Sequence, residues 1–419
     1  MLRTVTRQGG RWKWGTLADA ATVITGNTPP TSEADNYGSF IPFVKPSQLL
    51  DRPVDSGEQG LSQRGVSRGR VAPVGAVLVS CIGVRGKTGL ARVSVAFNQQ
   101  INAVVFAPSV LPAFGFYYAQ TLRSWLYAQS SATTLPIVNK SKFLAAPFPL
   151  VQIEEQREIV AEIEKQFSRL DEAVANLQRV KANLRRYRAS VLLDAFVVRR
   201  PNSGDESSDP TNVDLPVGWT WRTYADIGEV TTGFTPSTSE AANFGGAIPF
   251  FKPTDLDAGD NVRQAREYLS EQGLARGRRL PAGSVLVTCI GATIGKTGLA
   301  QVACATNQQI NSVSPIAGVA DARFVFWWTV SPRGQQQIHS NASATTLPII
   351  NKSKFSALAV PMPPLAAQRR IVEEIDCRLS IVREVEAEVD ANLKRALALR
   401  QSVLAAAFKP SGRPLPFLA

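Results

Sequence analysis

The residues whose types and spacing suggest phosphate chemistry occur twice in the chain. Residues 81–90 read CIGVRGKTGL, and residues 289–300 read CIGATIGKTGLA. A nucleotide-binding P-loop requires the pattern G-x-x-x-x-G-K-[ST], because its backbone N–H groups surround the phosphates in one fixed geometry. Only three residues separate Gly291 from Gly295, and the spacing in the first copy is shorter still. The variable spacing of the glycines argues against a P-loop. The informative observation is that the same sequence motif occurs twice in the chain.

The sequence offers few other residues for catalysis. His339 is the single histidine, which leaves no material for a Ser-His-Asp triad or a histidine metal site, and we interpret it as an ordinary surface residue. Residues 27–30 read NTPP, in which Thr28 interrupts the Asn-Pro-Pro-aromatic motif of amino-methyltransferases. No glycine-rich dinucleotide fingerprint follows a predicted strand. The sequence therefore predicts a chain with no catalytic centre and no metal of its own.

Length and charge indicate the size of the protein and the kind of partner. A chain of 419 residues is expected to form two to three domains. The net charge of +12 and the pI near 9.8 favour a polyanionic partner, with nucleic acid first and an acidic membrane second. The alternative is a basic protein without such a partner.

The lack of targeting segments and the spacing of the cysteines predict that the protein is cytoplasmic. The sequence contains no apolar run long enough to span a membrane, and its first residues lack the apolar segment of a signal peptide. The cysteines show no C-x-x-C spacing, which is typical of buried, reduced thiols in the cytoplasm. They are Cys81, Cys289, Cys304 and Cys377.

An internal duplication organises the chain. Residues 11–49 match residues 218–256, including the paired tryptophans near the start of each block and the matched Lys45 and Lys252. Two further blocks repeat in the same order, FNQQIN with TNQQIN and SATTLPIVNKSKF with SATTLPIINKSKF. The chain therefore contains two homologous units, each too long to be a solenoid repeat.

Each unit ends in a segment with a heptad pattern. Residues 153–198 and 365–408 place apolar side chains at intervals of seven without glycine or proline, which predicts two long helices with a coiled-coil seam. A helix of about 45 residues would extend about 67 Å, more than a small domain can cover, so we expect the two helices to pair, in an antiparallel arrangement. The predicted seam comprises Ile163, Leu170, Leu177, Leu184, Val191, Ile375, Val382, Val389 and Val403.

The remaining residues predict two similar globular domains of the α/β or α+β class. Short β-branched runs such as GAVLVSCIG alternate with glycine and proline turns, which indicates a curved sheet with many loops, and one helix is expected near residues 113–129. Residues 199–216 are rich in Pro, Ser, Asp and Asn, as expected for a linker. The predicted order is domain 1–150, helix 151–198, linker 199–216, domain 217–362, helix 363–409 and tail 410–419.

Three repeated motifs carry a resemblance to a known family. These are TLPxxNKxxF, the glutamine motif at the start of each helix (ending at Gln156 and Gln368), and the helix-closing sequences SVLLDAF and SVLAAAF. With the duplicated order of domain and helix, the chain resembles the DNA-specificity subunit of bacterial type I restriction-modification systems over almost its full length. The first glutamine motif lacks the second proline of the MPPLAAQ copy, which leaves room for a different start of the first helix.

The resemblance implies a non-catalytic subunit that reads DNA. Each globular domain would be a target-recognition domain docked on one half of a bipartite site in double-stranded DNA, with the paired helices holding the halves at a fixed separation. Two modification (methyltransferase) subunits would bring S-adenosylmethionine and flip the target adenine, because the methylated nitrogen is inaccessible in the stack. Restriction subunits, with ATP and Mg²⁺, would complete the nuclease. No cofactor is expected on this chain.

Candidate DNA-binding residues follow from the duplicated loops. Lysines and arginines on loops neutralise phosphates, whereas Arg, Asn and Gln read purine edges. The lysines of the NKSK motif are expected either to contact phosphates or to cap the next helix in solvent. Arg85 and Thr293 differ at matched loop positions, as base readers should, whereas the NQQIN stretch is interpreted as a buried amide network. The candidates are Lys45, Arg85, Lys87, Lys140, Lys142, Lys252, Thr293, Lys296, Lys352 and Lys354.

Two functions from other classes remain as alternatives. A nucleotide hydrolase with two sites would need both GKT loops to bind phosphate, and ATP binding by the purified chain would detect it. A coiled-coil adaptor without DNA contacts would explain the helices but not the basic charge or the duplicated domains. A salt-dependent gel shift with DNA would distinguish the adaptor from a DNA-binding protein.

Overall fold

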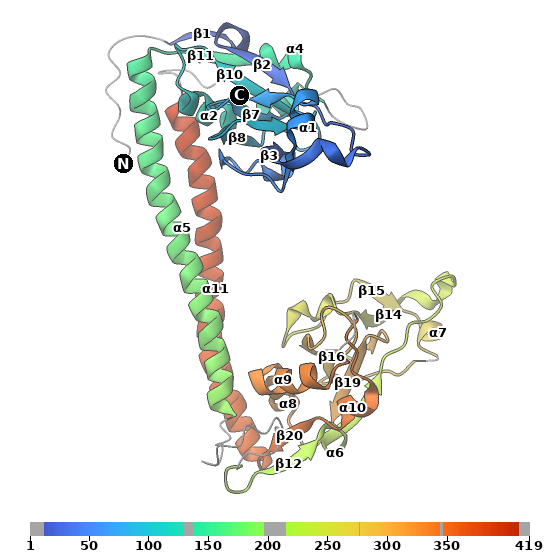
Figure 1. Ribbon diagram of the computed structural model, residues 1–419. Helices are drawn as coiled ribbons and strands as arrows, with labels where there is room; N and C mark the ends of the chain where they lie inside the picture. The colour runs from blue at the N-terminus through green and yellow to red at the C-terminus, as the bar shows by residue number, and fades with distance from the viewer. Residues whose placement is uncertain (1–11, 130–136, 197–214, 276, 344–346, 410–419) are drawn as a thin grey trace. The chain divides into compact units, whose positions relative to one another are not determined.

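The computed structural model describes residues 12–129, 137–196, 215–275, 277–343 and 347–409. The chain divides into two compact units, which we call unit 1 (Met1–Leu177 with Ala391–Ala419) and unit 2 (Gln178–Asp390). Each unit contains one globular domain and part of both long helices (Figure 1). Residues 199–214 of the expected linker and the expected tail at 410–419 lie outside the described residues.

In its described part, the domain of unit 1 is built on two small sheets. A five-stranded sheet has the order β2-β10-β7-β8-β4, and a four-stranded sheet has the order β5-β3-β9-β6. A separate antiparallel pair, β1 (Lys13–Thr16) with β11 (Pro147–Leu150), joins the two ends of the domain. The other strands are β2 (Ala21–Thr25), β3 (Tyr37–Val44), β4 (Arg52–Val54), β5 (Gln59–Leu61), β6 (Val71–Ala72), β7 (Val77–Ser80), β8 (Thr88–Ala91), β9 (Val95–Phe97) and β10 (Ile101–Phe106). The helices are α1 (Gln63–Arg68), α2 (Pro112–Thr121), α3 (Arg123–Ala128) and α4 (Lys140–Leu144).

The domain of unit 2 repeats this plan over its described residues. A four-stranded sheet has the order β13-β19-β16-β17, and a three-stranded sheet has the order β15-β14-β18. The pair β12 (Thr220–Thr223) with β20 (Ala359–Met362) matches β1 with β11. The other strands are β13 (Gly228–Thr232), β14 (Phe244–Phe251), β15 (Glu267–Leu269), β16 (Val285–Thr288), β17 (Thr297–Leu299), β18 (Ala305–Thr306) and β19 (Ile310–Pro315). The helices are α6 (Tyr224–Ile227), α7 (Glu271–Leu274), α8 (Ala322–Val330), α9 (Pro332–Asn341) and α10 (Lys352–Ser356).

The β-branched runs form the central strands of these sheets, as their sequence predicts. All four residues of β7 are buried, and alternate side chains point to opposite faces, so that Val77 and Val79 belong to one core and Leu78 to another. In β16, Val285 and Val287 likewise belong to one core and Leu286 to another. The helix expected near residues 113–129 is present as two helices, α2 and α3, which meet at Leu122. The observed class is the predicted mixture of strands and helices.

The two heptad segments are long helices that begin at equivalent residues. α5 (Ile153–Ala195) and α11 (Leu365–Ala407) each contain 43 residues. Gln156 and Gln368 fix the two starts in the same way: Oε1 accepts a 2.8 Å hydrogen bond from the backbone N–H of Leu111 or Asp321. Each Nε2 donates to two backbone carbonyls. The missing proline of the first copy therefore does not change where the helix begins, because the glutamine sets the register.

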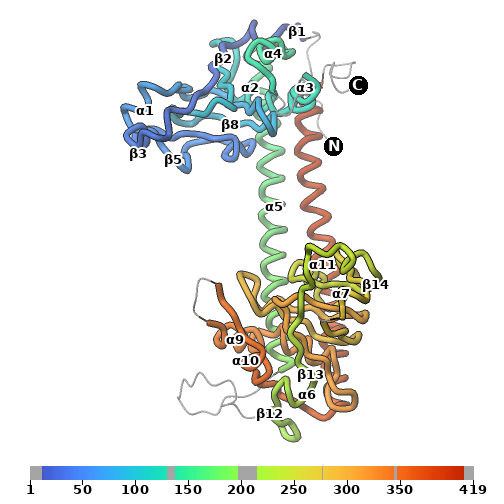
Figure 2. Tube along the Cα trace, turned by 90° about the vertical axis from the view of Figure 1, so that its right-hand side faces the viewer, coloured from blue at the N-terminus to red at the C-terminus, as the bar shows by residue number. Residues whose placement is uncertain are grey.

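The two helices pair in an antiparallel arrangement, and within each unit their segments run side by side (Figures 1 and 2). In unit 1, Arg400 of α11 bonds Asp171 of α5 at 2.6 Å and lies 3.9 Å from the ring centroid of Phe167. In unit 2, Lys181 of α5 bonds Asp390 of α11 at 2.6 Å. From the first contact to the second, the residue number rises along α5, from 171 to 181, and falls along α11, from 400 to 390. The two helices are therefore antiparallel. Each of the nine predicted seam residues is buried or half-buried.

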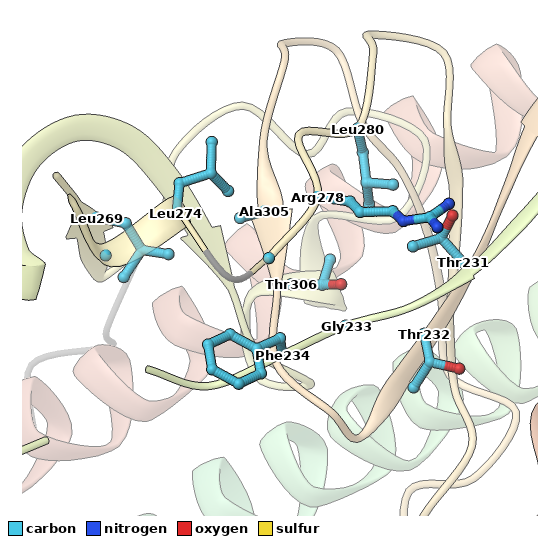
Figure 3. A pocket seen from close by; sticks show the side chains of 12 residues that line it. Thr231, Thr232, Gly233, Phe234, Leu269, Leu274, Arg278, Leu280, Ala305 and Thr306 are labelled. Atoms are coloured by element: carbon cyan, nitrogen blue, oxygen red, sulfur yellow. The ribbon is translucent and has the colours of Figure 1, made fainter. Parts of the chain in front are cut away.

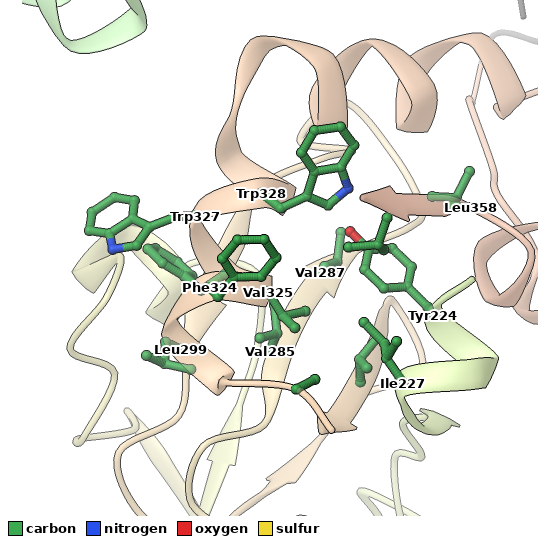
Figure 4. Close-up of a cluster of buried hydrophobic side chains, with 14 of the residues drawn as sticks. Tyr224, Ile227, Val285, Val287, Leu299, Phe324, Val325, Trp327, Trp328 and Leu358 are labelled. Carbon is green, nitrogen blue, oxygen red and sulfur yellow. The ribbon is translucent and has the colours of Figure 1, made fainter. Parts of the chain in front are cut away.

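Each long helix also completes the core of a domain with its C-terminal end. Phe196, just after α5, packs edge-to-face against Phe324 and Trp328 of α8, with ring centroids 5.4 Å apart in both pairs. Phe408, just after α11, packs in the same way against Phe114 and Tyr118 of α2, at 5.3 Å. Figure 4 shows Phe324 and Trp328 within the core of unit 2. Fully buried aromatic side chains contribute strongly to stability, so each helix end is part of a folded core.

The cysteines are not all in the predicted environment. Cys81, Cys289 and Cys304 are buried, and burial raises the pKa of each thiol to about 12. Cys377 is exposed, so the prediction of a buried thiol is wrong there. Cys377 lies two residues after the buried seam residue Ile375, and two helical positions correspond to a turn of about 200° away from that face.

Candidate nucleic-acid interface

The repeated GKT phrase forms the turn of a β-hairpin. It connects β7 to β8 in unit 1 and β16 to β17 in unit 2, and both strand pairs are antiparallel. Gly83 and Gly86 have φ values of 70° and 76°, and Gly291 and Gly295 have values of 98° and 85°, which explains the glycines. A P-loop leads from a strand into a helix, whereas here the GKT threonine opens a strand. The phrase is therefore a hairpin turn and not a nucleotide cradle.

Arg85 and Thr293 occupy different environments within these turns. Arg85 is only 6% exposed, and its guanidinium lies 4.3 Å from the ring centroid of Tyr127 on α3. Its Nε and Nη1 have no hydrogen-bond partner among the described residues. Thr293 is exposed. In this conformation Arg85 is stacked within the domain, so its predicted contact with a base would require the side chain to leave Tyr127.

Lys87 and Lys296 are partly enclosed by their own domains. Both side chains are half-buried, and Lys296 forms a 2.6 Å ion pair with Asp257. The contact of Lys87 and Lys296 with DNA remains a prediction.

Lys45 and Lys252 lie at the ends of equivalent strands. Lys45 directly follows β3 and donates to Oε1 of Gln59 at 3.3 Å, whereas Lys252 directly follows β14 and forms a 2.5 Å ion pair with Glu267. The ring centroid of Phe250 lies 5.7 Å from the Lys252 ammonium. Both lysines are therefore held at the same position of the fold, one by a neutral partner and one by a carboxylate.

The lysines of the NKSK motif lie on two short helices. Asn139 caps α4 by accepting a hydrogen bond from the N–H of Lys142, and Asn351 caps α10 in the same way, both at 2.9 Å. The motif is therefore a helix cap that leaves its lysines exposed, which agrees with both predicted interpretations. The preceding residues 131–136 and 344–346 lie outside the described part of the chain. The exposed lysines are Lys140, Lys142, Lys352 and Lys354.

The structure adds an arginine pair that the sequence analysis did not select. Arg70 Nη1 donates to the carbonyl of Thr25 at 2.7 Å, and the equivalent Arg278 forms a 2.7 Å ion pair with Glu229. Arg278 also lines a small pocket with residues 231–234, and Figure 3 shows its side chain extending toward Thr231. The signal for this pair was the tripeptide Arg-Gly-Arg, which occurs in both copies.

Other kinds of site find no support within the described residues. Among them, no group of three or more His, Cys, Asp or Glu side chains could hold a metal ion. Within the described chain, no helix combines the length and the apolar character needed to cross a membrane. What the fold does define is a protein of two homologous domains, each with exposed cations, joined by a pair of long helices.

Comparison with known proteins identifies this class. The family described as "Type I restriction modification DNA specificity domain" matches residues 10–182 and again residues 216–388. The two matches cover most of the chain and coincide with the internal duplication. The chain therefore belongs to the type I restriction-modification DNA specificity family, with two such domains in tandem.

Individual relatives agree with the family assignment. The EcoDI specificity subunit of Escherichia coli is 22% identical over 350 residues, which cover 77% of this chain and 76% of that protein. The MjaIX specificity subunit of Methanocaldococcus jannaschii is 22% identical over 272 residues, 63% of this chain and 62% of that protein. A solved chain from a study of complex assembly and conformational transition of the type I system is 21% identical, covers 96% of this chain and 98% of its own length, and has a TM-score of 0.72. The likeness to the solved chain shows the fold.

Proposed function

We propose that this chain is the DNA-specificity subunit of a type I restriction-modification complex and reads a bipartite site with one unit on each half. The observation that carries the proposal is the duplication: two domains of one family place the same lysines at equivalent positions. Two homologous readers in one chain would bind a site whose two halves resemble each other, as the half-sites of duplicated DNA-binding proteins do. The relatives are named as specificity subunits, in agreement with this role.

The long helices serve as the spacer and as the scaffold for partners in this proposal. Gln156 and Gln368 support it because each joins the start of a helix to its recognition domain through three hydrogen bonds. A domain held in this way cannot rotate about its helix without breaking buried hydrogen bonds, each of which costs about 1–3 kcal/mol to leave unmade. The separation of the two half-sites would then be fixed by the helices.

The chain itself is proposed to lack catalytic activity and to act in the cytoplasm. Two modification subunits would bind along the helices and supply S-adenosylmethionine together with the pocket for the flipped adenine. Restriction subunits would supply the ATP- and Mg²⁺-dependent nuclease. The absence of a nucleotide-binding geometry in the GKT hairpins supports this division, because the hairpins were the strongest candidates for a cofactor loop.

The test is DNA binding by the purified full chain in a gel shift at several salt concentrations. We expect affinity to fall linearly with the logarithm of the salt concentration, with a slope of about −0.9 for each phosphate neutralised. The same preparation should show no methyltransferase, nuclease or ATPase turnover. Loss of salt dependence would favour the coiled-coil adaptor, and turnover that survives mutation of every co-purified partner's active site would contradict the non-catalytic role.

A further inference from the structure

A threonine–glutamine hydrogen bond occurs at the same place on the surface of both units. The Thr28 hydroxyl donates to Oε1 of Gln99 at 2.6 Å, and the Thr235 hydroxyl donates to Oε1 of Gln308. Both glutamines are exposed. The bonded residues are far apart in sequence, and hydrogen bonds between exposed side chains contribute little to stability because water competes for the groups. Their recurrence in both units therefore calls for a cause other than stability.

The rest of the NQQIN stretch holds this glutamine in place. The side chain of Asn98 is folded onto Gln100: its Oδ1 accepts from the Gln100 N–H at 3.2 Å, and its Nδ2 donates to Gln100 Oε1 at 3.0 Å. Asn307 and Gln309 form the same two bonds in unit 2. The expected amide network is thus present around the turn, and its exposed member is Gln99 or Gln308.

The loop that carries the threonine is packed directly against this turn. A Cβ at Gly26 would lie 2.2 Å from the carbonyl oxygen of Asn98, and one at Gly233 would lie 2.1 Å from that of Asn307. No side chain fits at these distances, so the glycines allow the two backbones to touch. The threonine and the glutamine are therefore brought together by rigid backbone and not by mobile side chains alone.

In both units a lysine follows the strand next to the one that leads into the glutamine turn, and its ammonium group contacts the strand on the opposite side, at Gln59 of β5 or Glu267 of β15. β3 and β9 are parallel neighbours with Val44 opposite Phe97, so Lys45 and the glutamine turn follow the same end of adjacent strands. β14 and β18 place Lys252 beside the second turn in the same way. In unit 1, Arg70 donates to the carbonyl of Thr25, three residues before Thr28, whereas the equivalent Arg278 in unit 2 pairs with Glu229. We call the group Thr28, Gln99, Lys45 and Arg70, with its equivalents Thr235, Gln308, Lys252 and Arg278, the turn surface.

We propose that the turn surface of each unit binds the phosphate backbone of DNA, with Gln99 and Gln308 as donors to phosphate oxygens. Oε1 of each glutamine accepts from the threonine, which orients the amide so that Nε2 is the donor end. Among the described residues, Nε2 of neither glutamine has an acceptor in the structure's hydrogen bonds. An exposed amide that presents its donor end matches a phosphate, which offers only acceptors and negative charge.

Because the turn surface is repeated in both units, it favours a contact with the DNA backbone over a contact with the bases. Phosphate contacts set the position of a protein on the duplex and carry no sequence information, so two recognition domains can share them. Residues that read bases differ where the half-sites differ, whereas the turn surface keeps the same residue types in both units. This inference rests on the proposed function and adds the residues that set the docking position of each unit.

The test uses Gln99→Glu and Gln308→Glu, separately and together, in the full chain. Glutamate has the shape of glutamine and still accepts the threonine hydroxyl, but it replaces the donor with a negative charge facing the phosphate. We expect DNA affinity to fall at least about tenfold for each variant, equally for all sequences, because hydrogen bonds to charged groups are among the stronger ones. Gln178→Glu, on the exposed face of α5, is the matched control for the added charge and should change affinity little.

A second pair of variants removes the donor without adding charge. Gln99→Ala and Gln308→Ala should also weaken binding to all sequences, with the preferred sequence unchanged in a competition among duplexes. Affinity equal to that of the wild-type chain would overturn the inference and leave the proposed function intact. A change in the preferred base at one position would also overturn it, because the glutamine would then be a base reader. If the wild-type chain itself shows no salt-dependent DNA binding, the proposed function fails together with the inference.

Discussion

Phe408 packs edge-to-face against Phe114, with ring centroids 5.3 Å apart, so the end of the second long helix completes the core of the first recognition domain. Phe196 and Phe324 form the matching contact in unit 2. The core of unit 1 is therefore built from two separate stretches of chain, whereas unit 2 is the continuous stretch Gln178–Asp390. Folding of unit 1 therefore depends on residues from both ends of the described chain.

We expect Phe408→Ala to destabilise unit 1 and to leave unit 2 unchanged. Phe408 is fully buried, and truncation of a buried phenylalanine costs about 3–5 kcal/mol. Hydrogen exchange should accelerate in β7 and β10 but not in β16 and β19. Phe196→Ala is the matched control and should show the reverse pattern. Equal acceleration in both units would contradict this division of the two cores.

The seam between the helices can be tested with one substitution at two positions of α11. Val389 is 5% exposed, whereas Val385, one turn away, is 38% exposed. Val389→Asp places a charge against apolar surface, at a cost on the order of several kcal/mol, and should disrupt helix pairing. The variant should lose assembly with the modification subunits, as measured by co-purification, while both recognition domains remain folded. Val385→Asp should assemble normally, and equal assembly of the two variants would argue against the seam.

The ion pair of Lys252 predicts a difference between the two turn surfaces. Lys252 is paired with Glu267, whereas the equivalent Lys45 contacts the neutral Gln59. Glu267→Gln gives unit 2 the arrangement of unit 1, and the added positive charge should tighten DNA binding about twofold to fivefold at low salt, the scale of an exposed ion pair. Glu374→Gln, which breaks a surface ion pair on α11, is the control. An equal gain in the control would assign the effect to net charge alone.

The buried thiols predict both reactivity and pH dependence. Burial raises the pKa of Cys81, Cys289 and Cys304 from 9.0 to about 12, so these thiols stay protonated in the folded chain. At pH 8 under native conditions, only Cys377 should react rapidly with iodoacetamide. In the unfolded chain all thiols ionise near pH 9, so the stability that burial contributes is present below pH 9 and is lost as the pH rises toward 12. Rapid labelling of any of the three buried thiols would contradict the structure.

The sequence predicts the duplication and the helices because both leave regular patterns. Ile163, Leu170 and Leu177 recur at intervals of seven, and a heptad pattern is visible without coordinates. The contacts of Phe196 and Phe408 could not be predicted in this way, since the domain that a helix end meets depends on how the chain folds back. Gln156 and Gln368 stood out as motif residues, but their bonds to distant backbone groups required the structure.

The candidate interface shows where residue type and loop position are insufficient. Base reading by Arg85 stays a prediction, but its position does not follow from the turn sequence, because Tyr127 from α3 covers the side chain. Gln99 was expected to be buried with its neighbours, yet the asparagine on one side folds back and leaves it exposed. In both cases the outcome depends on a contact made across the fold, which local sequence does not specify.

The central claim is that each unit reads one half of a bipartite site while the helices set the spacing. The direct measurement is selection of bound sequences from a random duplex pool by the full chain assembled with its modification subunits. The wild-type chain should recover two short sequences separated by a fixed gap. A variant in which residues 289–298 replace residues 81–90 should change at most one of the two sequences and keep the gap. A single continuous sequence, or a changed gap in the variant, would contradict the account.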